Sequence, residues 1–432
     1  MNRFQFKIQF SLLSIIIIVM FVSSKDFCQN NQAKDLKVIK LLMIDGKYSE
    51  AIKILNSVIQ TDSSNVQALY YLGLNYEAIS NYLQAEKSLK VAVHYKAEDK
   101  NLLLTLGRNS FSAGLIIEAD TVLSKAFLLD SSDSQIQLVL GKVFMNEKKW
   151  GDAASIYSKL VKSDSTNSYF YEQLAQCRSN QGNAKEAIRN YQIAYKLNPK
   201  NQNTILNLSY LLFLNEQLDS AIAVVTAGLV FYPRSTVLLN NLGDFYLNLK
   251  KPDYDKAIMS YLSAFHYGDS SSTVLKDIGI CLYWKKDYLS SINFLEHSEE
   301  LDPKDANTFF YLGAVYKALG NYKKSLENFI KASVLLKSDF LANTYIQIAA
   351  VYQLDGKYND ALDYYRDALR ESPANKSILF YMAVIYDKLK SIKSAENFYN
   401  KFLADSNGAD KKLIDYAKER IVKLKNFKSL KR

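Results

Sequence analysis

The chain has 432 residues, of which 48% are hydrophobic and 23% are charged, and it contains 31 Tyr and 22 Phe but only 15 Gly and 5 Pro. This composition is too apolar and too aromatic for a disordered chain, and the few Gly and Pro argue against a collagenous or turn-dense all-β protein. Three Cys and three His are too few for a disulfide scaffold or a metal site with several protein ligands.

The formal net charge of +10 is concentrated at the two ends of the chain. Residues 1–24 carry a net charge of +2 and residues 410–432 carry +6, so the 385 residues between them carry only +2. A nucleic-acid-binding protein is expected to carry its basic groups as a patch or stripe on the folded body. The nearly neutral body therefore argues against a nucleic-acid partner.

The N-terminus has the three parts of a secretory signal peptide. A basic head with Arg3 and Lys7 precedes an apolar run over residues 10–22, and two serines follow. We therefore expect residues 1–24 to be a signal peptide that is cleaved after Ser24. Basic residues before the apolar run place the bulk of the chain outside the cytoplasm, which in a bacterium means the periplasm or an association with the outer membrane.

Two alternatives remain open for this region. The uncharged stretch 8–24 reaches the lower limit of a spanning helix, so the segment could also be an uncleaved membrane anchor. A cut before Gln29 is the second choice of cleavage site, and we expect residues 25–31 to be a linker in either case. Cys28 follows charged and aromatic residues rather than small aliphatic ones, which argues against lipidation at this position.

Small residues recur with a period of 34 residues through residues 32–409, which indicates a repeat array. One series consists of Gly73, Gly107, Gly141, Ala175, Ser209, Gly243, Gly279 and Gly313. A second series consists of Ala51, Ala85, Ala119, Ala153, Ala187, Ala221, Ala257, Ser291, Ser325, Ala361 and Ala395. The span corresponds to eleven units of 34 residues and two insertions of two residues each, around residues 250–253 and 340–341.

Each unit divides into two helical stretches with a turn between them. In the ninth unit Phe309, Leu312 and Tyr316 fall at the three- and four-residue spacing of one helical face, Gly320 breaks the run, and Phe329 belongs to the resumed pattern. Numbered from the start of each unit, Gly46, Gly114, Gly182, Gly320 and Gly356 are at position 15, and Pro199, Pro233, Pro303 and Pro373 are at position 32. Gly at 15 allows the turn between helices, and Pro at 32 ends the second helix.

Residues 410–432 follow the repeats and predict one further basic helix, with Leu413, Ala417, Ile421 and Leu424 on its apolar side. A terminal helix of this kind can cap the last exposed face of a repeat array. Its excess of Lys and Arg is also compatible with contact to an anionic membrane surface, or with an acidic partner.

The repeat pattern resembles that of the tetratricopeptide repeat family, whose consensus is W-x2-L-G-x2-Y, then A-x3-F, then P. The resemblance covers residues 32–409, although position 4 is Leu69, Leu103 or Phe309 where the family has Trp. It implies an all-α solenoid, a right-handed superhelix of helix-turn-helix units whose first helices line the concave side.

The resemblance also implies which side chains face the concave groove, namely those at positions 2, 5, 9, 12 and 13 of each unit. Units six, eight and nine are rich in apolar groups there, and the candidate binding residues are Leu206, Tyr210, Phe213, Leu214, Ile280, Tyr283, Trp284 and Phe310. Exposed aromatic side chains on a rigid surface anchor peptides or helices. The alternative is that several of them complete local packing or form a contact between copies of the chain.

Other chemistry is not indicated. The family's carboxylate clamp needs Asn at position 9, and no unit has it; Arg108 and Lys142 at this position are more simply interpreted as two solvated charges. Cys177 and Cys281 fall at a position where the family prefers Ala, so we expect small core residues. The three His are not spaced to form a metal site, and the sequence contains none of the common phosphate-binding, dinucleotide-binding or nucleophile motifs.

The sequence therefore predicts a non-enzymatic scaffold of the bacterial cell envelope that needs no cofactor or metal and binds a protein or peptide in its concave groove. The alternative function is a structural or assembly factor that acts through convex or terminal surfaces, including self-association or outer-membrane complex assembly. The identity of the partner and the oligomeric state are not encoded in any pattern of the sequence.

Overall fold

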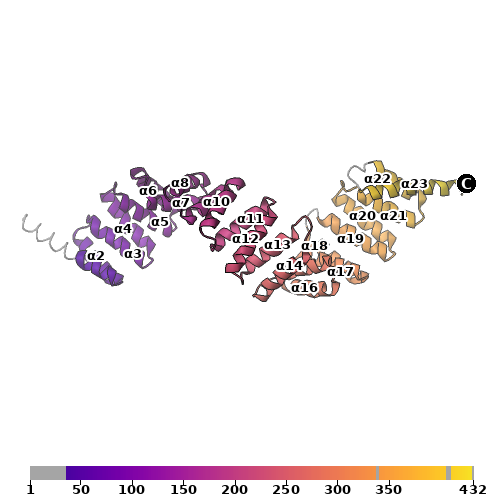
Figure 1. The fold of residues 1–432 in the computed structure, drawn as a ribbon, viewed down its shortest axis with the longest axis horizontal. Helices are drawn as coiled ribbons and strands as arrows, with labels where there is room; N and C mark the ends of the chain where they lie inside the picture. The colour runs from indigo at the N-terminus through magenta and orange to yellow at the C-terminus, as the bar shows by residue number, and fades with distance from the viewer. Residues whose placement is uncertain (1–35, 337–339, 405–409, 431–432) are drawn as a thin grey trace, which may run out of the picture. The chain divides into compact units, whose positions relative to one another are not determined.

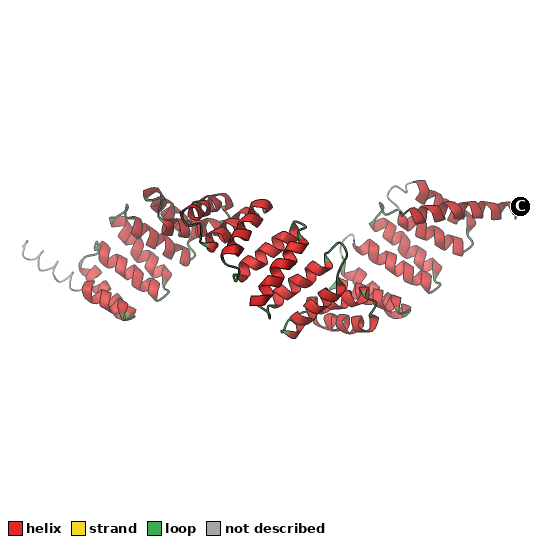
Figure 2. Ribbon diagram, in the orientation of Figure 1, coloured by secondary structure: helices red, strands yellow, loops and turns green. Residues whose placement is uncertain are grey.

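The computed structural model describes residues 36–336, 340–404 and 410–430. For residues 427–430 it describes only the helical backbone. The predicted signal peptide 1–24, the linker 25–31 and Cys28 lie outside this range. The described residues form helices joined by short turns, and they contain no strand (Figure 2). None of the described helices has the length and the hydropathy that crossing a membrane requires.

The helices fall into two compact bodies that divide between Leu211 and Leu212, here called the N-terminal body and the C-terminal body (Figure 1). The N-terminal body holds helical residues 36–44, α2 (Tyr48–Thr61), α3 (Val66–Ala78), α4 (Tyr82–Tyr95), α5 (Lys100–Ser112), α6 (Ile116–Leu129), α7 (Ser134–Asn146), α8 (Trp150–Ser163), α9 (Ser168–Asn180), α10 (Ala184–Leu197) and most of α11 (Gln202–Leu214). The C-terminal body holds α12 (Leu218–Phe231), α13 (Thr236–Leu247), α14 (Tyr254–His266), α15 (Ser272–Trp284), α16 (Tyr288–Leu301), α17 (Ala306–Ala318), α18 (Tyr322–Leu335), α19 (Phe340–Leu354), α20 (Tyr358–Glu371), α21 (Ser377–Lys388), α22 (Ile392–Ala404) and α23 (Lys411–Leu430).

Consecutive helices pack in antiparallel pairs within each body. In the N-terminal body α3 packs against α4, α5 against α6, α7 against α8 and α9 against α10, and each second helix also contacts the first helix of the next pair. The first helices begin at residues 66, 100, 134 and 168, which reproduces the 34-residue period of the sequence. The predicted all-α fold of helix-turn-helix units is therefore confirmed, while the right-handed superhelix and the boundaries of the eleven units stay predictions.

The small residue at position 8 is where the two helices of a pair approach most closely. A Cβ atom added to Gly243 would lie 2.6 Å from the ring of Tyr261, and one added to Gly313 would lie 2.8 Å from the ring of Phe329. Both distances are shorter than real carbon contacts, so a larger residue would push the second helix away. The glycine series thus reflects packing of α13 on α14 and of α17 on α18.

The turn between the helices of a pair requires a left-handed backbone conformation at position 15. Gly114 has φ of 81° there, which a glycine adopts without strain. The same conformation occurs at Lys148 with φ of 60° and at Lys286 with φ of 66°. The left-handed turn therefore also forms in units that have no glycine at position 15.

The two insertions have different structural outcomes. Around residues 250–253 the extra residues lengthen the loop between α13 and α14, and the Asp253 backbone N–H donates to the carbonyl of Tyr246 at 3.0 Å. The insertion around residues 340–341 lies at the start of α19, which has 15 residues, whereas α17 has 13. The second insertion thus extends a first helix at its N-terminus.

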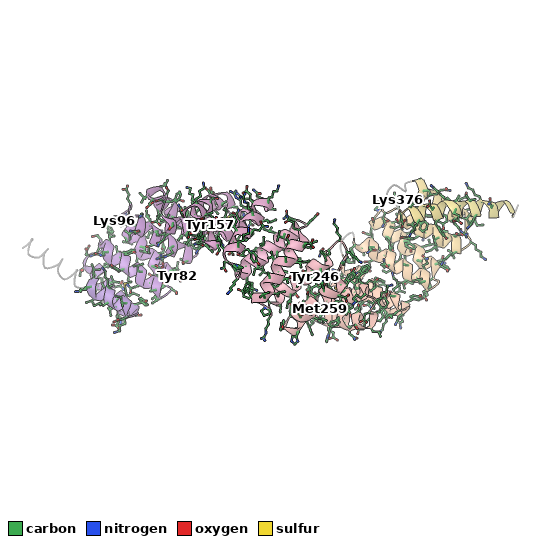
Figure 3. All side chains as sticks on the ribbon, in the orientation of Figure 1. Tyr82, Lys96, Tyr157, Tyr246, Met259 and Lys376 are labelled. Carbon is green, nitrogen blue, oxygen red and sulfur yellow. The ribbon has the colours of Figure 1, made fainter. Side chains whose placement is uncertain are left out.

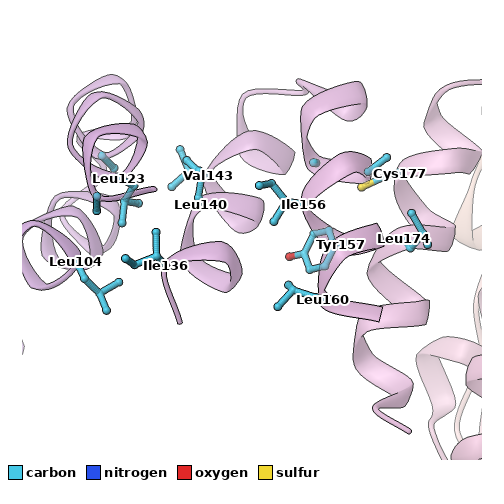
Figure 4. Packing of buried hydrophobic residues seen from close by; sticks show 14 of the residues in the cluster. Leu104, Leu123, Ile136, Leu140, Val143, Ile156, Tyr157, Leu160, Leu174 and Cys177 are labelled. Carbon is cyan, nitrogen blue, oxygen red and sulfur yellow. The ribbon is translucent and has the colours of Figure 1, made fainter. Parts of the chain in front are cut away.

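A continuous apolar core runs between the helix pairs. In the N-terminal body it joins Leu123 on α6, Leu140 on α7, Tyr157 on α8 and Cys177 on α9, all at most 2% exposed (Figure 4). Cys281 is equally buried in the C-terminal body, and both thiols are free. The prediction that the two cysteines are core residues is confirmed.

The last helix, α23, packs against α22. Its Ala417, Ile421 and Leu424 are buried in a cluster with Phe380 and Phe402. The guanidinium group of Arg420 pairs with Asp387 on α21, with Nη2 3.0 Å from Oδ1. The apolar side that the sequence predicts for this helix therefore covers the end of the C-terminal body.

Candidate functional site

Four aromatic side chains from α14, α15 and α17 form one surface in the C-terminal body, here called the aromatic face and defined by Tyr254, Tyr283, Trp284 and Tyr311. The Tyr254 and Trp284 rings stack with centroids 6.4 Å apart and planes 10° apart. The Tyr283 ring lies 5.3 Å from Trp284 and 5.8 Å from Tyr311 in edge-on contacts. Such contacts fix the rings in place, because edge-on and stacked pairs add attraction beyond burial.

The aromatic face keeps part of its surface accessible. Trp284 is 52% exposed, whereas Tyr254, Tyr283 and Tyr311 are partly buried. Burial raises the pKa of Tyr283 and of Tyr311, so both phenols stay neutral. Figure 3 draws the side chains on the ribbon, with Tyr246 of α13 and Met259 of α14 labelled. The surface thus combines rigid rings with a large exposed indole.

Phe310, which the sequence also proposes as a binding residue, has a different environment. It is 9% exposed, and its ring contacts Phe329 at 5.4 Å and Phe340 at 4.9 Å. It therefore offers little surface to a partner and serves mainly to pack α17 against α18 and α19. Ile280 is partly exposed on α15, four residues before Trp284 and thus on the same side of the helix.

The four candidates on α11 differ in how far they are exposed. Tyr210 and Leu214 are 54% and 56% exposed, and Leu206 and Phe213 are partly buried. The Phe213 ring stacks on the buried Phe245 ring with centroids 5.2 Å apart, so this residue contributes to packing.

A carboxylate that the sequence analysis missed lies beside the aromatic face. Asp277 on α15 is partly buried, and among the described residues it accepts no hydrogen bond and forms no ion pair. Burial raises the pKa of its carboxyl to about 6, against the opposing effect of Lys276 and with a smaller contribution from the negative charges of Asp244 and Asp305. The available signal was an Asp inside the apolar segment of α15, at a unit position outside the five that the family resemblance marks.

The charged neighbours of Asp277 are already paired. The Lys276 ammonium group lies 3.0 Å from Asp305 Oδ2, and the Tyr261 hydroxyl donates to Asp244 Oδ1 at 2.6 Å. Among these acidic groups, Asp277 is thus the one that makes neither a hydrogen bond nor an ion pair within the described chain.

The N-terminal body carries a second candidate surface, on α3, α5 and α7, which the sequence analysis did not propose. A cavity of about 590 Å³ there is lined by Tyr70, Arg108 and Gln135, among others. Arg108, which the sequence analysis interprets as a solvated charge, is partly exposed and also forms an ion pair: its Nη2 donates to Glu77 Oε2 at 3.0 Å and its Nε lies 2.9 Å from Oε1. Arg108 also lines, together with Glu77, a second cavity of about 560 Å³.

The described residues contain no group of three or more His, Cys, Asp or Glu side chains that could hold a metal ion. Lys142, the other charge at position 9 that the sequence singled out, lies over the Tyr169 ring with Nζ 5.9 Å from the centroid.

Two family models, both described as tetratricopeptide repeat, match residues 304–370 and 353–410. The helix pairs of α17 to α22 that these matches cover have the same form as the pairs earlier in the chain. The chain is a tetratricopeptide repeat protein.

Among curated proteins, this tetratricopeptide repeat protein is similar to the BBSome complex member BBS4 of Bos taurus, with 26% identity over 148 residues that cover 34% of this chain and 28% of the relative. The mouse protein of the same name is 24% identical over 33% of each chain. The matched region thus spans a third or less of the length of either relative.

Among solved structures, the Cut9 and Hcn1 hetero-tetramer of the APC/C has a TM-score of 0.45 and 13% identity, over 88% of this chain and 94% of that chain. YrrB, described as a tetratricopeptide repeat protein with an unusual peptide-binding site, has a TM-score of 0.39 and 19% identity, over 46% of this chain and 99% of that chain. Yeast Tom70 has a TM-score of 0.39 and 12% identity, over 90% of this chain and 95% of that chain.

Proposed function

We propose that this tetratricopeptide repeat protein is a non-enzymatic scaffold of the bacterial cell envelope that captures a protein or peptide partner on the aromatic face. The observation that carries the proposal is the half-exposed Trp284, held between the Tyr254 and Tyr283 rings. Rigid aromatic side chains contribute large contact areas and lose little side-chain entropy on binding. Repeat solenoids supply extended surfaces on which such anchors are presented.

The envelope part of the proposal rests on the N-terminal sequence pattern. A basic head, an apolar run and small residues over residues 1–24 are typical of secretion signals. Fractionation of cells that express the full chain tests this: we expect the protein in the periplasmic or membrane fraction and not in the cytosol. Recovery of an uncleaved chain from the cytosol contradicts it.

Contact with an anionic membrane surface through α23 is part of the same proposal. Lys411, Lys412, Lys418 and Lys425 are exposed on this helix, opposite the buried side that includes Ala417. Basic side chains near a membrane are attracted to anionic lipids by about 1 kcal/mol each. Co-sedimentation with vesicles of phosphatidylglycerol, compared with vesicles of phosphatidylcholine, measures this attraction, and equal sedimentation with both contradicts it.

A second candidate function, assembly through a convex surface, is favoured by α6. Ile117 and Leu128 on this helix are 79% and 85% exposed, and Ile117 borders a cavity of about 830 Å³ that also includes Val93 and Val122. Exposed apolar groups around a cavity mark interaction surfaces on soluble proteins. Retention of all partners after Ile117→Ser with Leu128→Ser argues against this candidate.

Crosslinking in cells, followed by affinity purification and mass spectrometry, tests the proposed function. Tyr283→Ser with Trp284→Ser removes two rings of the aromatic face, and we expect it to lose a partner that the wild-type protein retains. Tyr70→Ser with Tyr71→Ser on α3 is the matched control, since this is also an adjacent ring pair, with centroids 5.8 Å apart.

The two variants distinguish the aromatic face from the cavity on α3, α5 and α7 as the binding site. Loss of the partner only in the Tyr283 and Trp284 variant supports the aromatic face, provided that circular dichroism shows unchanged helix content. Loss only in the Tyr70 and Tyr71 variant transfers the site to the cavity on α3, α5 and α7 and contradicts the proposal.

A further inference from the structure

The aromatic face has an electrostatic feature that restricts what can occupy it. Asp277 lies on α15 three residues before Ile280 and seven residues before Trp284, so it occupies the same side of this helix as the exposed indole. Its charge also interacts with the phenols of Tyr261 and Tyr311. No described side chain pairs with it directly. A partly buried carboxylate without a partner is unfavourable for the folded chain, since desolvation penalises the charged form.

The cations near this carboxylate are engaged elsewhere. Lys276 pairs with Asp305 at 3.0 Å, and Lys285, which follows Trp284 in the chain, pairs with Asp255 on α14. Lys317 on α17, the helix that carries Tyr311, donates to Gln347. The described part of the chain thus presents a negative charge on the same helix as the exposed Trp284 and supplies no direct counterion for it.

We infer that the aromatic face receives a lysine or arginine side chain of the protein partner, with Asp277 as its counterion and the rings of Trp284, Tyr254 and Tyr311 as its walls. This inference rests on the proposed function and names the chemistry of the partner at that site. A cation placed over an aromatic ring is attracted by the negative face of the ring, and the attraction grows when water is displaced. An ionised hydrogen bond to a carboxylate is about twice as strong as a neutral one.

Other occupants fit this surface less well. An acidic segment would meet the charges of Asp277 and Asp244, which is unfavourable at short distance. A purely apolar segment would cover the rings but would also bury Asp277 without a partner, at a desolvation cost that reduces the affinity. A basic side chain is the group whose charge offsets the carboxylate while its aliphatic stem packs on the rings.

Selection from a random peptide library displayed on phage tests the inference with the full mature chain as bait. We expect peptides retained by the wild-type protein to be enriched in Lys or Arg at one position, next to apolar or aromatic residues. The bait Asp277→Asn should retain the apolar enrichment and lose the basic one. The bait with Tyr283→Ser and Trp284→Ser should enrich no peptide family above an unrelated protein.

The selection distinguishes the failure of the inference from the failure of the proposed function. Enrichment of peptides without a basic position, or the same basic position on the Asp277→Asn bait, overturns the inference and leaves the aromatic face as a binding site. No enrichment on the wild-type bait, or equal enrichment on the bait without the two rings, overturns both.

The affinity of one selected peptide supplies a quantitative second measurement. We expect Asp277→Asn to weaken its binding about tenfold, which corresponds to the loss of one charge-assisted contact, and we expect the wild-type affinity to fall as salt is added. Asp255→Asn is the matched control, because Asp255 is an exposed acid on α14 that pairs with Lys285. Equal weakening by both substitutions would show a general effect of net charge and would overturn the role of Asp277.

Discussion

Arg108 on α5 and Asp277 on α15 both lie on first helices of the repeat, one in each body, but only Arg108 is balanced within the chain. Arg108 forms a two-point contact with Glu77, which also accepts a hydrogen bond from Asn109 at 3.0 Å. Asp277 has no such contact among the described residues, and it lies on the helix that carries Tyr283 and Trp284. The same scaffold therefore produces one surface that satisfies its own charges and another that leaves a charge for a partner.

This difference between Arg108 and Asp277 is the one expected between a charge that stabilises the fold and a charge that binds a partner. A charge that is paired within the fold needs no ligand as a counterion. An unpaired, partly buried charge lowers the free energy of unfolding, and a ligand that pairs with it stabilises the folded protein. On this account Asp277 lowers the stability of the C-terminal body and makes the aromatic face selective for a basic partner. The N-terminal body has no equivalent cost at Arg108.

The largest expected effect is on binding, at the exposed indole. Trp284→Ala should weaken the binding of a selected peptide by about 2 to 4 kcal/mol, as substitution of a central aromatic anchor does. Arg108→Ala should leave this affinity unchanged, because its ion pair lies in the other body. Isothermal titration calorimetry on the three proteins measures both, and an equal loss of affinity in the two variants would abolish the contrast between the bodies.

The next effect is on stability and has the opposite sign. Because the folded-state pKa of Asp277 is raised to about 6, ionisation of this group destabilises the folded protein as pH rises from about 4 to about 6. Asp277→Asn should therefore increase the free energy of unfolding by about 2 to 3 kcal/mol at neutral pH, and the gain should disappear below about pH 4. Urea titrations at the two pH values provide the measurement, and a variant that is less stable than wild type at neutral pH contradicts the cost assigned to Asp277.

A smaller effect concerns the pH dependence of binding. A basic group binds the ionised form of Asp277, so the affinity should be constant above neutral pH and fall about tenfold for each pH unit below the pKa of about 6. The charged and titratable groups that surround Asp277 are Asp244, Tyr261, Lys276, Cys281, Asp305 and Tyr311. Asp277→Asn is expected to flatten the profile. A variant with the wild-type profile would assign the titration to one of these neighbours.

The smallest effect should be the same in both bodies. Lys148 and Lys286 hold the left-handed turn position that glycine occupies in other units, so Lys148→Gly and Lys286→Gly should each stabilise the protein by about 0.5 to 1 kcal/mol. Thermal unfolding followed by circular dichroism measures the shift. If either substitution destabilises the protein, the contacts of the lysine side chain stabilise the fold by more than the relief of backbone strain at this position.

The period of the sequence predicts most of the fold, because glycine and alanine recur where helices must approach closely. The contact of Gly243 with Tyr261 follows directly from such a position. The turn at Lys286 was less visible, since its left-handed backbone is imposed by the flanking helices and not by the residue itself. Asn and Asp side chains that cap the helix N-termini, such as Asp133 and Asn321, also recur with the period and mark where helices begin.

The candidate site was predictable only in part, for a physical reason. The period indicates which side of a helix a residue occupies, and the Tyr283 and Trp284 rings are in contact. The period does not show how far a side chain is covered by the next repeat. Phe310 is therefore packed rather than available. The environment of Asp277 depends on side chains from α13, α14 and α17, which no single segment of the sequence reveals.

The central claim is that the aromatic face, and not the cavity of the N-terminal body, contacts the partner. Incorporation of the photo-crosslinking residue p-benzoylphenylalanine in place of Trp284, and separately in place of Tyr70, tests it in living cells. The account predicts a discrete crosslinked species of higher mass from position 284 and none from position 70. A crosslinked species from position 70 alone would contradict the account and place the partner on α3, α5 and α7.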